Sequence, residues 1–161
     1  MPTTDIVRGY TPGAIGRIAE MHGRYYGREW GFPSSFEALV AREVADFVDG
    51  CDPAREGLWL LDGERVLGSI ALVRPRDGEP ARLRWFITAD AARGSGAGAL
   101  LMQAAMDFAR QAGYRRLYLT TFAGLDAARH LYERHGFVLT AESRDDHWGA
   151  AVNEQRFDWH A

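Results

Sequence analysis

The sequence predicts an α/β (α+β) fold in which about four helices pack on one mixed, mostly antiparallel sheet. Short apolar runs separated by turn residues fill the middle third, a pattern typical of antiparallel strands. Further on, a strand, a glycine-rich loop, a helix with one apolar face and another strand follow one another, as in a βαβ unit. With 161 residues and 47% hydrophobic content, we expect residues 1–161 to form a single domain.

The first third of the chain predicts one strand and two helices. Residues 4–10 favour a short strand. Thr11 followed by Pro12 is typical of an N-cap and the first helical position. Ser34 and Glu37 have the spacing of a capping box, so we expect a second helix to begin there.

Three strands are predicted in the middle of the chain. Residues 58–61 and 66–73 are apolar and flank Asp62-Gly63, a residue pair that favours a tight hairpin turn. A looser turn rich in proline, glycine and charge follows, and residues 81–88 form the next strand.

The last part of the chain predicts the βαβ unit and two further strands. A helix begins at Ala97 and is closed by Gly113, and residues 114–121 then return as a strand parallel to residues 81–88. The expected apolar stripe of this helix comprises Leu100, Leu101, Ala104, Ala105, Phe108 and Ala112. A short helix over residues 126–135 and strands over 137–142 and 152–159 complete the fold.

Composition excludes several functional classes. The 19 basic and 22 acidic residues give a net charge of −3, so we expect no binding to nucleic acid or to an anionic membrane. The only cysteine, Cys51, cannot form an internal disulfide, which favours a reduced thiol in a cytoplasmic protein. The first ten residues do not resemble a signal peptide, no apolar run is long enough to span a membrane, and we assign no metal site.

The glycine-rich loop of residues 93–98 predicts a phosphate-binding site. Glycines let the backbone approach a ligand closely, and the first turn of the following helix offers unpaired N–H groups. A nucleotide-hydrolase loop would continue Gly-Lys-Ser/Thr, whereas this chain has Gly98-Ala99-Leu100. A dinucleotide site would need an acidic residue at the end of the next strand, where this chain has Thr121 and Phe122.

Two motifs then carry a resemblance to a known family. They are, in order, Arg93-x-x-Gly96-x-Gly98 and Ala128-Arg129-His130-Leu131-Tyr132-Glu133-Arg134-His135-Gly136-Phe137. Together they resemble the GNAT superfamily of acyl-CoA-dependent N-acyltransferases. The aromatic segment 22–32, the glycine loop and residues 121–125 are also similar to acetyltransferase domains fused to MarR-type regulators, although no DNA-binding half is present. The resemblance implies a central sheet with a splayed pair of parallel strands.

The same resemblance implies where acetyl-CoA binds. The loop would bind the pyrophosphate, and backbone groups of the preceding strand would pair with the pantetheine amides. Tyr132 matches the general acid of the family, since a phenol stays protonated until the CoA thiolate forms. The implied donor-binding residues are Phe86, Ile87, Thr88, Arg93, Gly94, Ser95, Gly96, Ala97, Gly98 and Ala99.

Two departures from the family pattern concern the base and the pantetheine site. Many relatives place a glutamate early in the strand before the loop, where this chain has Arg82-Leu83-Arg84. The amine would then lose its proton to Glu29 or His22, through a water chain, or in solution before binding. Leu125 stands where relatives often have an asparagine beside the pantetheine arm.

We therefore expect an N-acetyltransferase that uses acetyl-CoA and acts on the amine of a small molecule or on an exposed amino group. Tyr26, Glu29 and Trp30 are the candidate acceptor-binding residues, because this segment interleaves aromatic and charged side chains. The alternative is a noncatalytic acyl-CoA-binding or sensing module. Trp148 and Trp159 favour packing between the subunits of a homodimer, although we expect at least one of them to lie in the core of its own chain.

Overall fold

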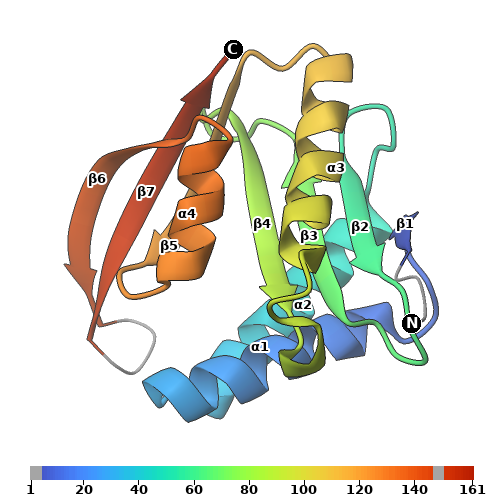
Figure 1. Cartoon of the computed structure of the whole chain (residues 1–161), viewed down its shortest axis with the longest axis vertical. Coiled ribbons are helices and arrows are strands. Elements are labelled where there is room, and N and C mark those ends of the chain that lie inside the picture. Colours follow the sequence, from blue (N-terminus) through green and yellow to red (C-terminus); the bar gives the residue numbers. More distant parts are fainter. Residues whose placement is uncertain (1–4, 147–150) are drawn as a thin grey trace.

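The computed structural model describes residues 5–146 and 151–161, whose strands form one sheet in the order β1-β2-β3-β4-β5-β7-β6 (Figure 1). All neighbouring strands are antiparallel except β4 and β5, which are parallel, so the predicted mixed sheet and its βαβ unit are confirmed. The strands are β1 (Ile6–Arg8), β2 (Gly57–Leu61), β3 (Gly68–Val73), β4 (Ala81–Thr88), β5 (Arg116–Phe122), β6 (Val138–Asp145) and β7 (Val152–His160).

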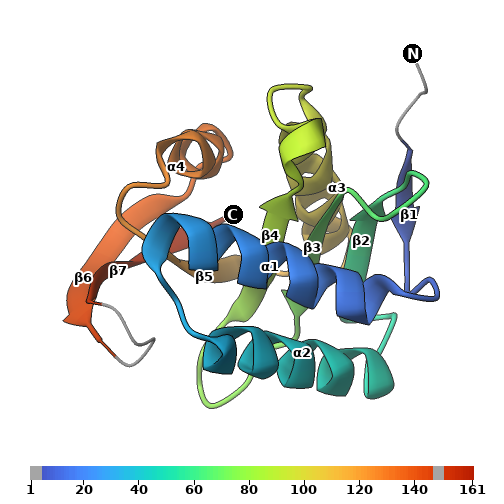
Figure 2. The same ribbon diagram turned by 90° about the horizontal axis from the view of Figure 1, so that it is seen from below.

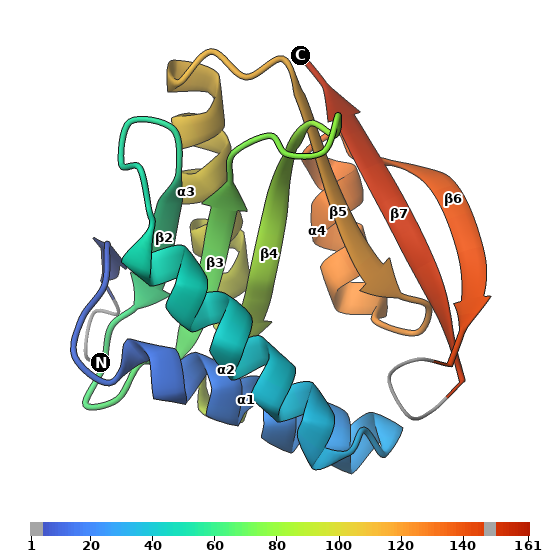
Figure 3. The same cartoon turned by 180° about the vertical axis from the view of Figure 1, so that it is seen from behind.

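Helices cover both faces of this sheet. On one face lie α3 (Ala97–Gln111) and α4 (Asp126–Arg134), in front of the sheet in Figure 1. On the other lie α1 (Ala14–Trp30) and α2 (Ser34–Asp49), which come to the front in Figure 3. A short 3-10 turn, η1 (Asp90–Ala92), precedes α3. Each face of the sheet therefore has its own hydrophobic core.

The two parallel strands separate soon after they meet. β4 and β5 pair only at Ala81 with Leu117 and at Arg82 with Tyr118. Beyond these pairs β4 stays bonded to β3 and β5 stays bonded to β7. The sheet consequently opens between β4 and β5, as the resemblance implied. α1 crosses the ends of these two strands that lie at the bottom of Figure 1, as the view from below shows (Figure 2).

A β-bulge in β4 accompanies this separation. Trp85 and Phe86 together oppose the single residue Ile70 of β3, and Trp85 has a left-handed backbone with φ 49°. The Ser69 hydroxyl donates a hydrogen bond of 2.7 Å to the Trp85 carbonyl oxygen. Because the bulge shifts the strand alternation, Trp85 packs in the core beneath α1 and α2 while Phe86 turns toward α3 and α4.

The helix starts differ from the sequence prediction. α1 is capped by Gly13 in a left-handed conformation with φ 91°, and Thr11 contributes only its carbonyl oxygen, which accepts from the N–H of Ala14. α2 does begin at Ser34, but Pro33 occupies the cap position and no side-chain cap bond forms. Both predicted side-chain caps were wrong because backbone geometry closes these ends instead.

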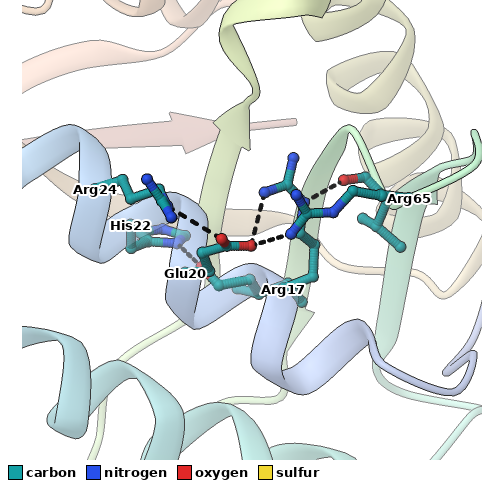
Figure 4. Close-up of polar contacts among 7 residues, drawn as sticks. Arg17, Glu20, His22, Arg24 and Arg65 are labelled. Atoms are coloured by element: carbon teal, nitrogen blue, oxygen red, sulfur yellow. Dashed lines mark hydrogen bonds and ion pairs between the residues drawn. The ribbon is translucent and has the colours of Figure 1, made fainter.

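The hairpin between β2 and β3 is longer than predicted. Residues 62–67 connect the strands, and the N–H of Leu67 bonds to the carbonyl of Leu61 at 2.8 Å. This loop is fastened to α1, because Arg17 Nε donates to the Val66 carbonyl at 2.8 Å and Arg65 pairs with Glu20 (Figure 4). The Asp62-Gly63 pair therefore starts a tethered loop, not a two-residue turn.

Packing of α3 corrects the predicted apolar stripe at two positions, because Leu100 and Ala112 are both exposed. Leu101 is fully buried, whereas Leu100, which was expected to face the core, is 53% exposed. At the far end of the sheet Trp159 is only 6% exposed and belongs to the core of this chain, so it offers no subunit contact. Trp148 lies outside the described residues. None of the helices in residues 5–146 and 151–161 is long and apolar enough to cross a membrane.

Replacing Leu101 with alanine should lower the free energy of unfolding by about 2–5 kcal/mol, since the change leaves a cavity under α3. The matched change at Leu100 should alter it by less than about 0.5 kcal/mol, because that side chain is half in solvent. Urea denaturation followed by tryptophan fluorescence measures both, and similar losses in the two variants would contradict this packing.

Candidate functional site

Two cavities lie on opposite faces of the sheet, next to the opening between β4 and β5. The larger, which we name the α3–α4 cavity, has a volume of about 590 Å³ and is lined by the glycine loop, the start of α3, the end of β4 and α4. The smaller, the α1–α2 cavity, has a volume of about 130 Å³ and lies between α1, α2 and the same two strands. Both are lined by Tyr26, Phe86, Thr121 and Tyr132. The two cavities therefore adjoin at these four residues.

The predicted donor-binding residues gather around the larger cavity, with Ser95 as the exception. The Ser95 hydroxyl instead donates to the carbonyl of Ala92 within the loop. The residues that line the cavity are Phe86, Ile87, Thr88, Arg93, Gly94, Gly96, Ala97, Gly98 and Ala99.

The glycine loop has the backbone geometry of an anion cradle. Gly94 and Gly96 have left-handed backbones with φ 76° and 84°, which glycine adopts without strain. Within the described residues, the N–H groups of Gly94, Gly96, Gly98 and Ala99 have no hydrogen-bond partner in the protein. These donors stand at the positive end of the α3 dipole, so the loop can hold phosphate oxygens.

Arg93 braces the loop and also borders the larger cavity. Its Nη1 lies 2.7 Å from an Asp90 carboxylate oxygen, and its Nη2 donates to the Thr88 carbonyl at 3.2 Å. The guanidinium also lies 4.5 Å from the centre of the Tyr25 ring. Asp90 in turn pairs with Arg28 of α1 at 3.0 Å, so this network ties the loop to the end of α1.

Tyr132 is buried on α4, with only 6% of its surface exposed. Its ring centre lies 6.0 Å from that of Phe86 and 5.8 Å from that of Phe157. Burial raises the pKa of the Tyr132 phenol above its ordinary value, and a hydrogen bond with Thr121 opposes this rise. The hydroxyl is therefore protonated at neutral pH and can donate a proton.

Only one of the three candidate acceptor residues lines a cavity. Tyr26 lines both cavities, and burial raises the pKa of its phenol. Glu29 lines neither cavity and bonds to Arg28 at 2.9 Å on the surface of α1. Trp30 also lies outside both linings, with its ring centre 6.1 Å from that of Phe122.

His22, the other candidate base, does line the α1–α2 cavity and is 6% exposed. Its Nδ1 lies 2.7 Å from the Ile18 carbonyl oxygen, so Nδ1 carries the proton and Nε2 is an acceptor (Figure 4). Burial lowers the pKa of His22 to about 4. The imidazole is therefore neutral at pH 7 and holds a second proton poorly.

Sequence reasoning missed the charged residues of the smaller cavity. Glu43 of α2 and Arg82 and Arg84 of β4 all line it. Glu43 Oε2 lies 2.9 Å from Arg84 Nη1. The two arginines were noticed only as a departure from a family pattern. Glu43 lies beside the apolar stripe of α2. A carboxylate at such a position is usually exposed to solvent, so the sequence did not indicate a functional role.

Two other residues have limited roles at the site. Leu125 lines the α3–α4 cavity, where its side chain offers no hydrogen bond. Cys51 lines neither cavity, and burial raises the pKa of its thiol. The described part of the chain contains no cluster of three metal-ligating side chains.

Comparison with known proteins identifies the family. Residues 16–137 match the Acetyltransferase (GNAT) family, so the match spans most of the chain. The chain belongs to the GNAT family. Membership makes it an acyltransferase of the N-acetyltransferase type, and the predicted resemblance is confirmed at this level. The comparison with curated proteins gives no match.

Solved GNAT structures share the whole fold. An acetyltransferase from Streptococcus agalactiae is 21% identical, with a TM-score of 0.75 over 100% of both chains. A ribosomal-protein-alanine N-acetyltransferase from Brucella melitensis is 17% identical, with a TM-score of 0.76 over 98% of this chain and 99% of that one. A GNAT family acetyltransferase from Elizabethkingia anophelis with acetyl-CoA bound is 16% identical, with a TM-score of 0.59 over 74% and 82%. None of these three is described as fused to a MarR-type regulator, so that narrower resemblance stays a prediction.

The low pKa of His22 makes the stability of this GNAT domain depend on pH. Because the unfolded imidazole has a pKa of about 6.5, the unfolded state binds the proton more readily below that pH. This contribution is complete above pH 6.5 and is lost as the pH falls toward 4. Between pH 7 and pH 5 the wild type should lose about 2 kcal/mol more stability than His22→Gln. Urea denaturation at the two pH values measures this difference.

His130→Gln is the matched control, since His130 is exposed on α4. It should keep the wild-type pH dependence. An unchanged pH dependence in His22→Gln would show that His22 is not held neutral by its burial.

Proposed function

We propose that the chain transfers an acetyl group from acetyl-CoA to a primary amine of a small molecule or an exposed amino group, by direct attack in a ternary complex. The observation that carries this proposal is the pair of cavities on opposite faces of the sheet, which share Tyr26, Phe86, Thr121 and Tyr132. The donor occupies the α3–α4 cavity and the acceptor occupies the α1–α2 cavity. Their reacting atoms meet in the opening between β4 and β5.

The α3–α4 cavity suits the chemical parts of CoA. The unpartnered N–H groups of the glycine loop bind the pyrophosphate oxygens. Ile87 and Thr88 pair with β3 on one edge of β4, while the other edge of β4 has no β5 partner beyond Arg82. The pantetheine amides can add to this edge as a further strand would.

The reaction needs one proton removed and one delivered. The amine nitrogen attacks the thioester carbonyl carbon, and the tetrahedral intermediate collapses with cleavage of the C–S bond. Tyr132 donates its phenolic proton to the departing sulfur, and the proton lost by the amine nitrogen restores the neutral phenol. Burial supports this role only in that it keeps the phenol protonated, so the proton is present on Tyr132 when the C–S bond breaks.

The position of the cysteine supports direct transfer over a covalent acetyl-enzyme. Cys51 is the only cysteine of the chain, lines neither cavity and has a raised thiol pKa, so it is a poor nucleophile here. Intersecting initial-rate lines when both substrates are varied are the kinetic pattern expected of a ternary complex.

The predicted bases are poorly suited to a direct role. The pKa of about 4 makes the His22 imidazole a weak base, and Glu29 lines neither cavity. We infer that the ammonium proton leaves through water or before the amine binds, two of the routes that the sequence left open.

Tyr132→Phe should lower kcat at least about 100-fold, because the sulfur then departs without its proton donor. Affinity for acetyl-CoA should stay within about twofold, since only a hydroxyl is removed. Stopped-flow detection of the CoA thiol across a panel of amines and calorimetric titration with acetyl-CoA measure the two quantities.

Tyr114→Phe is the matched control, since the Tyr114 hydroxyl donates to the Arg55 carbonyl at 2.8 Å, away from both cavities. It should leave kcat unchanged. Wild-type turnover that survives in Tyr132→Phe would remove the assigned acid. Tight acetyl-CoA binding without turnover on any amine would support the noncatalytic sensor instead.

Gly96→Ala should weaken acetyl-CoA binding about tenfold or more, because a side chain is strained at φ 84° and the cradle must reshape. Gly113→Ala is the control, because Gly113 has nearly the same φ of 85° at the far end of α3. Both variants should lose about 1–2 kcal/mol of stability. Only Gly96→Ala should lose affinity in the titration, and equal affinities would contradict the assignment of the loop.

A further inference from the structure

We propose that the acceptor of this transferase carries a carboxylate close to its amine, and that the Arg82 guanidinium binds this carboxylate in the α1–α2 cavity. The acceptors are then small amino-acid-like molecules. This inference rests on the proposed function and names the substrate class of the same site.

The hydrogen bonding of Arg82 is incomplete. Its Nη2 donates to the Thr120 hydroxyl at 2.8 Å, and its guanidinium lies 5.6 Å from the centre of the Tyr118 ring. Its Nε is buried and has no hydrogen-bond partner, the one such side-chain atom in the described part of the chain. A buried donor without an acceptor is costly, and a carboxylate is the group that can accept from Nε and a terminal nitrogen together.

The charge of Arg82 is also uncompensated. Glu43 pairs with the neighbouring Arg84 at 2.9 Å and neutralises it. Burial, and then the charge of Arg84, lowers the pKa of Arg82. Glu43 and Glu154 act in the opposite direction, but within residues 5–146 and 151–161 neither forms an ion pair with Arg82. With His22 neutral at pH 7, the cavity retains one positive charge for an anion.

The position of Arg82 matches the proposed point of reaction. Thr120 and Thr121 are consecutive on β5, where one bonds to Arg82 and the other to Tyr132. Successive strand residues rise by about 3.3 Å and face opposite sides of a sheet. A carboxylate on Arg82 therefore lies near the level of the opening, and an amine a few bonds away can reach it. A volume of about 130 Å³ suits a molecule of this size.

The test compares free L-amino acids with their carboxamides and with the corresponding decarboxylated amines. With the wild-type chain, kcat/KM should favour the acids on the order of 100-fold, as expected for hydrogen bonds to a charged group. In Arg82→Gln the preference should fall to within about threefold while acetyl-CoA affinity is retained. Arg82→Lys keeps the charge without the planar fork, so it should restore only part of the preference.

Arg42→Gln is the matched control, because Arg42 is exposed on α2 and lines neither cavity. It removes one positive charge nearby and should keep the full preference. Equal rates for acids and amides in the wild type, better rates with peptide N-termini than with free amino acids, or an intact preference in Arg82→Gln would each overturn the proposal.

A binding measurement separates this inference from the proposed function. N-acetylamino acids and their amides are titrated into the wild-type chain and the Arg82 variants in the presence of CoA. Tighter binding of the acids that disappears in Arg82→Gln supports the carboxylate site even if no amine is acetylated. A lack of acetylation would contradict only the proposed transfer reaction. Equal binding of acid and amide overturns the site even if some other amine is a substrate.

Discussion

The separation of β4 from β5 after Arg82 is the constraint on which the rest of the structure depends. Each strand keeps its outer neighbour, so the opening leaves the remaining hydrogen-bond ladders intact. A continuous sheet would isolate the two helical layers from each other. Because the ladder stops after two pairs, a cavity on each face shares Tyr26, Phe86, Thr121 and Tyr132. In the proposed reaction, donor and acceptor approach the opening from opposite faces of the sheet.

The surrounding elements hold this opening in place. The bulge at Trp85 turns Phe86 toward Tyr132, and the Ser69 hydroxyl fixes the carbonyl of the strained residue. α1 is anchored at two places. Glu20 binds Arg17 and Arg65 near the β2–β3 loop (Figure 4). Arg28 binds Asp90 beside the glycine loop. Individual surface ion pairs contribute little to stability, but bonds that tie two loops to one helix restrict how the site can deform.

How much of the site can be predicted from the sequence depends on whether backbone groups of one segment or side chains from several elements form it. The proposed donor side is formed largely by backbone groups of one contiguous loop, so it follows from glycine spacing and stays a prediction. The limits of β4 and the start of α3, also predicted from the sequence, are confirmed. The acceptor side is formed by side chains from α1, α2, β4 and β5, which only tertiary packing brings together. Glu43 was therefore not predicted, and Glu29 was named as one candidate although it bonds to Arg28 at the surface. Leu100 was misjudged for a similar reason, since the face that α3 buries depends on the sheet beneath it.

The buried polar groups of the opening divide into those that are satisfied and those that are not. Tyr132 has Thr121, Arg84 has Glu43 and His22 has the Ile18 carbonyl, so these groups are held in one protonation state and one orientation. Arg82 keeps one donor, its buried Nε, without an acceptor. Within residues 5–146 and 151–161 no other buried side-chain nitrogen or oxygen lacks a hydrogen-bond partner. The unsatisfied Nε adds nothing to stability, because an apolar residue would fill the space without the desolvation cost. The unpartnered donor therefore supports the proposed carboxylate of the acceptor, which would supply the missing hydrogen-bond partner beside the opening.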